Sequence, residues 1–251
     1  SSCKKDENKD TTFNIFSVND DIELGNQLKQ EIESNPGTYP LLNENQYSQA
    51  YQHLYRIRDS ILIHGDLKYA DQFDWDVDII EDDSILNAFC APGGYICFYT
   101  GIIKYLDNEA QLAGVMGHEM AHADRRHSTD QLTKAYGLQL LLSIVLGNNP
   151  NQLAEIAAGL AAGVATLAFS RDAEYESDEF SVKYLYNTAY DARGVAGFFE
   201  KIGEASGPEF LSTHPSPENR VEKITEWWES LGGKEGNWYE ANYQNIKNSL
   251  P

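Results

Sequence analysis

The sequence predicts an α+β fold, with one mostly helical domain and a small antiparallel sheet whose edge strand borders a cleft. Several segments carry apolar residues at three-and-four spacing, which indicates amphipathic helices. One stretch alternates apolar and acidic residues, and a Gly-Gly pair follows it, which indicates strands and a hairpin turn. The chain has 251 residues and 41% hydrophobic content, so it can bury one sizeable core.

The amino end is expected to be a disordered tether over residues 1–19. Ser1 and Ser2 precede Cys3, and a charged tail follows. Small residues before a cysteine resemble the cleavage region of a bacterial lipoprotein. That resemblance implies that the Cys3 thiol carries lipid and anchors the protein in the bacterial cell envelope, facing the periplasm or the surface. The alternative is a disordered terminus with an incidental cysteine.

Two scaffold helices are predicted after the tether, over 20–34 and 43–64, within an N-terminal helical part at 20–70. A break at 35–37, with the sequence Asn-Pro-Gly, separates them. We assign no chemistry to His53 or His64, because a lone histidine on a helix is far more often structural than a ligand.

Three strands are predicted next, over 73–80, 85–91 and 95–100. If Gly93-Gly94 formed a two-residue turn, Cys90 and Cys97 would stand directly opposite each other at a hydrogen-bonded pair, where the strands are further apart. We therefore expect two packed thiols rather than a disulfide. An edge strand beside a cleft can bind an extended peptide as an additional strand, and an ordinary hairpin is the alternative.

An H-E-x-x-H sequence lies in an apolar run that predicts a helix from about 108 to about 126, with Asp107 as its N-cap. Residues four apart share one helix face, so His118 and His122 can present two imidazole nitrogens to one metal ion. Glu119 lies on the rim of that face and can accept a proton from a water held on the open side. The pattern is typical of hydrolytic metal sites, and two surface histidines on an ordinary helix are the alternative.

The charge balance argues against a nucleic-acid partner. Lys and Arg total 19 against 39 Asp and Glu, and the formal charge of -20 repels nucleic acid and anionic lipid headgroups alike.

The very apolar segments 138–146 and 153–169 predict a helical hairpin packed on the core or over the cleft. A membrane dip is the less favoured alternative.

Another helix opens after Ser170. Its residues Arg171, Glu174 and Asp178 share one face, so Glu174 can complete a His-His-Glu metal site while Asp178 holds a ligand imidazole from behind. A simple salt-bridged face is the alternative.

Two further helices are predicted, one after Asp191 and one that starts with Pro217 at its first position. The proline-rich loop before the second helix carries His214. His127, at the end of the H-E-x-x-H helix, is expected to point away from the ligand face and is given a structural role.

Four ordered motifs resemble peptidase family forty-eight of the metallopeptidases, the gluzincin group that includes HtpX, the Oma-type mitochondrial peptidase and the CAAX prenyl proteases. The motifs are Asn87-Ala88-Phe89 with Pro92-Gly93-Gly94-Tyr95-Ile96, His118-Glu119-Met120-Ala121-His122, Ser170-Arg171-Asp172-Ala173-Glu174 with Ser177-Asp178, and Thr213-His214-Pro215 with Pro217 and Arg220. The resemblance covers about residues 70–230 and points to the soluble periplasmic members. It implies one zinc metallopeptidase domain at 20–251, with its catalytic core at 70–230 and a C-terminal extension at 231–251.

The resemblance also implies a zinc endopeptidase with one Zn²⁺ per chain and Glu119 as general base. The implied zinc ligands are His118, His122 and Glu174. The residues implied to hold substrate on the edge strand are Asn87, Ala88 and Phe89. The chain departs from the family where Ser177 replaces a usual alanine and where Cys90 and Cys97 replace usual apolar residues, and neither change touches the implied chemistry.

His214 has two predicted roles. It can fill the open corner of the zinc as a fourth ligand and displace the catalytic water, or it can join Arg220 in donating a hydrogen bond to the oxyanion of the reaction. A loop histidine that caps local backbone is the structural alternative. We expect the resting enzyme to be latent, with His214 as the fourth zinc ligand.

Two functions are compatible with these residues. The first is a zinc endopeptidase that cleaves unfolded polypeptides in quality control of misfolded or misassembled envelope proteins. The second is a chaperone-like or scaffold module in which zinc only staples the fold. Glu119 favours the enzyme, because a structural site with four protein ligands has no use for a base.

Overall fold

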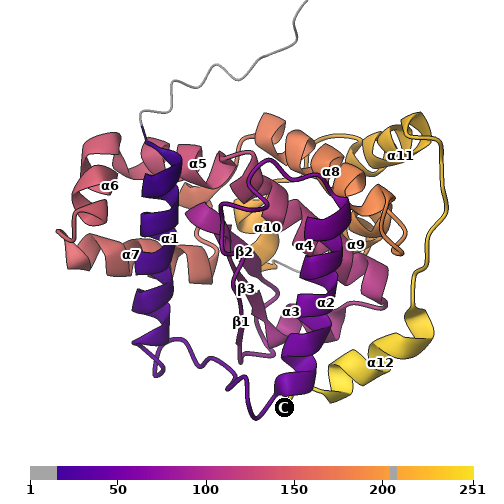
Figure 1. The fold of residues 1–251 in the computed structure, drawn as a ribbon, viewed down its shortest axis with the longest axis horizontal. Coiled ribbons are helices and arrows are strands. Elements are labelled where there is room, and N and C mark those ends of the chain that lie inside the picture. The colour runs from indigo at the N-terminus through magenta and orange to yellow at the C-terminus, as the bar shows by residue number, and fades with distance from the viewer. Residues whose placement is uncertain (1–15, 204–207) are drawn as a thin grey trace, which may run out of the picture.

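The fold is built around a short sheet buried on both faces (Figure 1). The computed structural model describes residues 16–203 and 208–251. The described strands are β1 (Val77–Ile80), β2 (Ala88–Ala91) and β3 (Tyr95–Tyr99). The longer helices are α1 (Val18–Glu33), α2 (Ser48–His64), α4 (Glu109–Asp124), α5 (His127–Tyr136), α6 (Leu138–Val145), α7 (Pro150–Ala162), α8 (Arg171–Tyr186), α9 (Gly194–Ile202), α11 (Arg220–Ser230) and α12 (Glu240–Asn248). Short helical turns are η1 (Pro92–Gly94), α3 (Thr100–Tyr105), η2 (Ala165–Leu167) and α10 (Glu209–Thr213).

The sheet is mixed, so the prediction of an antiparallel sheet is wrong in one pairing. The strand order is β1-β3-β2, with β2 antiparallel to β3 and β1 parallel to β3. The hairpin turn forces the first pairing, whereas the connection 81–87 reverses the chain and delivers β2 to the far edge of β3. β1 is also shorter than predicted, because Trp75 adopts a left-handed φ of 52° that interrupts extended backbone. β2 is an edge strand, as predicted.

The two cysteines lie on opposite faces of the sheet. The turn contains Pro92, Gly93 and Gly94, so Cys90 pairs with Ile96, and the prediction that it stands opposite Cys97 is wrong. Within the described residues both cysteines are buried free thiols, as predicted.

α1 and α7 cover one face of the sheet, and α6 packs against both of these helices on the outside (Figure 1). The N-terminus of α1 is a capping box in which Ser17 and Asp20 exchange hydrogen bonds, at 3.1 Å from Asp20 N to Ser17 Oγ and 2.8 Å from Ser17 N to Asp20 Oδ2. Phe16 is fully buried and α1 starts at Val18, so the fold begins before residue 20. Cys3 and the rest of residues 1–15 lie outside the described part of the chain.

The opposite face of the sheet packs against the larger cluster of helices, with α4 in contact with α2, α8 and α9. α2 buries Tyr51, Leu54, Ile57 and Ile61 at the predicted three-and-four spacing. α11 begins at Arg220 after a left-handed Asn219, so Pro217 is not at its first position. Across residues 16–203 and 208–251, no helix combines the length and apolarity needed to cross a membrane.

Candidate metal centre

α4 carries the motif and is buried along its whole length. Asn108, rather than the predicted Asp107, is the N-cap, and its side chain accepts a hydrogen bond from Gln111 N at 2.9 Å. Two glycines let neighbouring helices approach closely. A Cβ on Gly114 would lie 2.2 Å from the backbone nitrogen of Val195 on α9, and one on Gly117 would lie 3.0 Å from a side chain of α8. The sequence of α4 therefore sets how near α8 comes to the two histidines.

α8 supplies the acidic residues of the site. Ser170 caps the helix by accepting a hydrogen bond from Ala173 N at 3.2 Å. Glu174 and Asp178 lie one turn apart, fully buried, on the face that packs against α4. Asp178 Oδ1 lies 2.9 Å from His118 Nδ1, so the predicted contact between Asp178 and an imidazole of the motif is present.

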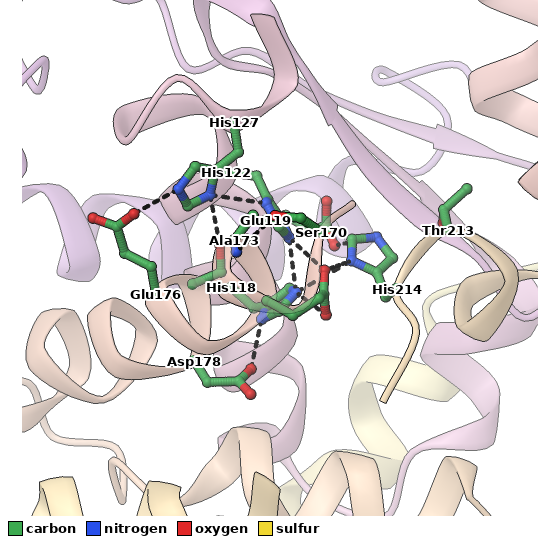
Figure 2. A network of polar contacts seen from close by, with 12 residues as sticks. His118, Glu119, His122, His127, Ser170, Ala173, Glu176, Asp178, Thr213 and His214 are labelled. Carbon is green, nitrogen blue, oxygen red and sulfur yellow. Dashed lines mark hydrogen bonds and ion pairs between the residues drawn. The ribbon is translucent and has the colours of Figure 1, made fainter. Parts of the chain in front are cut away.

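Four side chains converge on one point, and all of them are buried. Three of the four, His118, His122 and His214, are labelled in Figure 2. The donor atoms of the four side chains are His118 Nε2, His122 Nε2, the carboxylate of Glu174 and His214 Nδ1. The separations are 3.0 Å between the nitrogens of His118 and His122, 3.1 Å from His122 to Glu174, 3.3 Å from His118 to His214 and 2.9 Å from His214 to Glu174. Ligands about 2.05 Å from a tetrahedral zinc ion are about 3.3 Å apart, so the group fits zinc in size and in donor type.

Burial and mutual charge set the protonation of these groups. Burial lowers the pKa of His122 well below its ordinary value, which leaves the neutral ring that a metal needs. Burial alone would lower the pKa of His118, but the charge of Glu174 and the hydrogen bond to Asp178 raise it to about 9. Burial alone would raise the pKa of Glu174, but the charges of His214 and His118 hold it well below its ordinary value. Glu174 therefore stays ionised beside the imidazoles.

Glu119 faces a small cavity next to the donor group. Its Oε1 lies 3.3 Å from His214 Nε2, yet within the described residues that oxygen makes no hydrogen bond. Burial raises the pKa of Glu119. The cavity has a volume of about 10 Å³, which suits about one water molecule. The residues that line it are Phe89, Cys90, Glu119, Gln131, Leu160, Leu167, Phe169, Thr213 and His214.

Arg220 lies behind the donor group, against the acidic residues of α8. Its Nε donates to Asp178 Oδ2 at 2.7 Å, and its Nη2 donates to Glu174 Oε2 at 2.5 Å. The guanidinium carbon lies 3.4 Å from the centroid of the Phe199 ring. Among its described contacts, Nη1 has no hydrogen-bond partner. Arg220 thus fixes Glu174, and its role as an oxyanion donor stays a prediction.

The three edge-strand residues occupy different places. Phe89 lines the cavity beside Glu119. Asn87 is buried, and its Nδ2 donates to Ala161 O at 3.1 Å, which ties the start of β2 to the end of α7. Ala88 is buried on the other face of the sheet. Their role in holding substrate stays a prediction.

The structure corrects the prediction for His127. A left-handed Arg126, with φ 62°, separates α4 from α5 and turns the chain back on itself. His127 Nδ1 therefore lies 3.2 Å from His122 Nδ1 (Figure 2). Aromatic contacts to the site were also missed, since Phe169 stacks on His122 at 3.7 Å between ring centroids and Phe210 stacks on His214 at 4.0 Å. Nothing in the sequence next to either phenylalanine indicated that its ring faces an imidazole.

Comparison with known proteins agrees with this geometry. The chain is 30% identical over 166 residues to the mitochondrial metalloendopeptidase OMA1 of Arabidopsis thaliana, covering 65% of this chain and 33% of that protein. It is 32% identical over 157 residues to the beta-barrel assembly-enhancing protease of Escherichia coli K12, covering 57% of this chain and 32% of that protein. OMA1 of Schizosaccharomyces pombe is 31% identical over 160 residues, covering 61% of this chain and 46% of that protein.

The chain thus spans about a third to somewhat less than half of the length of these relatives. The sequence model of peptidase family M48 matches residues 49–228, well over half of the chain and including every residue of the donor group. The chain therefore belongs to peptidase family M48, a family of metallopeptidases.

Proposed function

We propose that this protein is a zinc-dependent endopeptidase that acts on unfolded or misassembled polypeptides. The observation that carries the proposal is the pairing of a buried His118, His122 and Glu174 donor group with a buried Glu119 that has an oxygen free of hydrogen bonds among the described residues. A purely structural metal site needs the donors and gains nothing from the extra carboxylate.

Zinc, when bound, would polarise the scissile carbonyl and lower the pKa of a water molecule to about 7. Glu119 would accept the proton of that water and pass it to the leaving amine. Burial raises the pKa of Glu119, which suits a group that must both accept a proton and release it again. Asp178 and Arg220 would keep His118 and Glu174 fixed throughout.

We further propose that the structure represents a latent state. His214 Nδ1 lies among the donor atoms, where it would serve as the fourth ligand and displace the catalytic water. Leu160, Leu167 and Phe169 line the cavity, which is far too small for a peptide. A substrate would have to displace His214 and these apolar side chains before it reached Glu119.

The proposed substrates are extended segments of envelope proteins. β2 is an edge strand beside the cavity, so a peptide could add to it through backbone hydrogen bonds that are indifferent to side-chain identity. The similarity to proteins named beta-barrel assembly-enhancing protease supports quality control in a bacterial envelope. Periplasmic or surface location and lipid attachment at Cys3 belong to the same proposal.

A chaperone-like or scaffold module stapled by zinc is the second candidate, and the observation that favours it is the fourth donor, His214, which would complete a closed site. The two candidates differ in what happens to a bound polypeptide. A binding module would retain it, whereas a peptidase would cut it.

The test measures zinc content and cleavage of casein by the wild type and by His214→Ala, before chelation, after EDTA, and after zinc is added back. We expect one zinc ion per chain, cleavage that EDTA abolishes, and recovery with zinc. Cleavage that persists after the zinc has been removed would refute zinc dependence. Stoichiometric zinc without cleavage by either protein would refute the endopeptidase and favour the binding module.

A further inference from the structure

The ring of His122 is held by a chain of contacts that leads away from the donor group (Figure 2). Its Nε2 faces the other donors, and its Nδ1 lies 3.2 Å from His127 Nδ1. His127 Nε2 lies 2.8 Å from Glu176 Oε2, and Glu176 Oε1 accepts from Arg125 Nε at 2.9 Å. His118 differs, because its Nδ1 contacts the carboxylate of Asp178 directly.

The hydrogens in the contacts between His122, His127 and Glu176 can be assigned from the chemistry of neutral imidazole, which has one N–H and one acceptor nitrogen. If His122 Nε2 binds a metal, Nδ1 must carry the hydrogen and donate it. His127 Nδ1 must then accept, which places its own hydrogen on Nε2, where it donates to Glu176. A single pair of tautomers therefore satisfies both contacts with neutral rings.

The fold specifies this arrangement from two separate elements. His127 opens α5 directly after the left-handed Arg126, and it is 8% exposed, so its ring has little freedom to turn away. Glu176 comes from α8, two residues beyond Glu174 and on a different side of that helix. Arg125 Nε donates to the other oxygen of this carboxylate at 2.9 Å, so Glu176 is held in place as the partner of His127.

Ser177 competes with His122 for the Nδ1 atom of His127. Its Oγ lies 3.2 Å from His127 Nδ1, the same nitrogen that faces His122. A hydroxyl can rotate, so Ser177 can yield that nitrogen to His122 or take it. Its removal should leave the contact between the two imidazoles intact.

We propose that His127 and Glu176 are positioning residues, which hold His122 in the orientation and tautomer that bind zinc. This inference rests on the proposed zinc site. Partners behind a metal-binding imidazole fix its tautomer and raise its basicity, and their loss typically weakens metal binding about 10- to 100-fold. His127 links Glu176 to His122, because its Nε2 contacts Glu176 and its Nδ1 contacts His122.

The experiment compares His127→Leu with His127→Asn in the full chain. Leucine removes the acceptor, whereas the side-chain oxygen of asparagine can stand where Nδ1 stands. The dissociation constant for zinc is measured by competition with a chromophoric chelator. We expect His127→Leu to weaken zinc binding about 10- to 100-fold and His127→Asn to stay within about threefold of the wild type.

A second pair of variants guards against a folding artefact at residue 127. Glu176→Ala should weaken zinc binding about tenfold, whereas Glu179→Ala, which removes a carboxylate paired with Lys183 on the same helix, should not. Ser177→Ala should bind zinc as the wild type does. Thermal unfolding in EDTA reports the stability of each protein without metal.

The variants are also assayed with saturating zinc, and a positioning role predicts a lower kcat with an unchanged KM. Wild-type zinc affinity in both His127→Leu and Glu176→Ala would overturn the inference. So would equal weakening in His127→Leu and His127→Asn that follows their loss of stability in EDTA. If the wild type itself binds no zinc, the proposed function fails first, so the two failures are distinguishable.

Discussion

Replacement of Arg220 by methionine should expose how strongly the donor group depends on its buried counter-charge. In the wild type the guanidinium is 2% exposed and contacts two carboxylates that are 0% exposed, those of Glu174 and Asp178. Methionine keeps an apolar stem of similar length but leaves both carboxylates without this cation. Removal of one partner from a buried ion pair typically costs about 3–5 kcal/mol, so we expect Arg220→Met to lose about that much stability in EDTA.

Zinc should reduce this cost. A bound cation would pair with Glu174, so only Asp178 would lose its counter-charge, and we expect the loss to fall to about half of its value in EDTA. The assay is urea-induced unfolding followed by tryptophan fluorescence, in EDTA and in saturating zinc. The control is Arg58→Met, because Arg58 also lies over an aromatic ring, at 4.5 Å from that of Tyr55, but its partner Asp59 is 53% exposed.

We expect the control to cost no more than about 1 kcal/mol in either condition. If Arg220→Met cost no more than the control in EDTA, the counter-charge argument would be wrong. If its cost were equal with and without zinc, the metal would not share Glu174 with Arg220.

Four further substitutions test the site and its scaffold. His118→Ala and Glu174→Ala should each abolish stoichiometric zinc binding in metal analysis, because each removes a donor; full zinc content in either would exclude that ligand. His214→Ala should raise casein cleavage if His214 mainly blocks the metal, as we expect, whereas a fall of about 100-fold would assign it to transition-state stabilisation. Gly194→Ala should destabilise the protein by about 1–3 kcal/mol or more in urea unfolding, because its Cβ would lie 1.9 Å from a carbonyl oxygen of α4. Gly37→Ala, with nothing within 4 Å of the new Cβ, is its control, and equal costs would contradict this packing argument.

Local sequence predicted the centre of the site well. The helix bearing His118 and His122, and the one-turn spacing of Glu174 and Asp178, depend only on helical periodicity, and the structure has both. The edge position of β2 also agrees with the prediction. The two helix features are set by residues within a few positions of each other.

The missed features depend on backbone turns that side-chain patterns do not reveal. Arginine seldom adopts a left-handed conformation, so nothing marked Arg126 as the residue where the chain changes direction between α4 and α5. A helix continued to residue 126 therefore placed His127 on the wrong side. The left-handed Trp75 shortened β1 for the same reason. β1 pairs in parallel with β3, which is not the next strand in the sequence. The alternation of apolar and polar residues within a strand does not indicate which strand it pairs with.

The most direct test of the proposed peptidase is the activity of Glu119→Gln at confirmed zinc occupancy. The amide keeps the size of the side chain and leaves His118, His122 and Glu174 in place, but it cannot accept the proton of the attacking water. We expect one zinc ion per chain, an unchanged fold by circular dichroism, and casein cleavage below a few per cent of the wild-type rate. Cleavage at more than a few per cent of the wild-type rate, with zinc bound, would contradict the assignment of Glu119 as the general base.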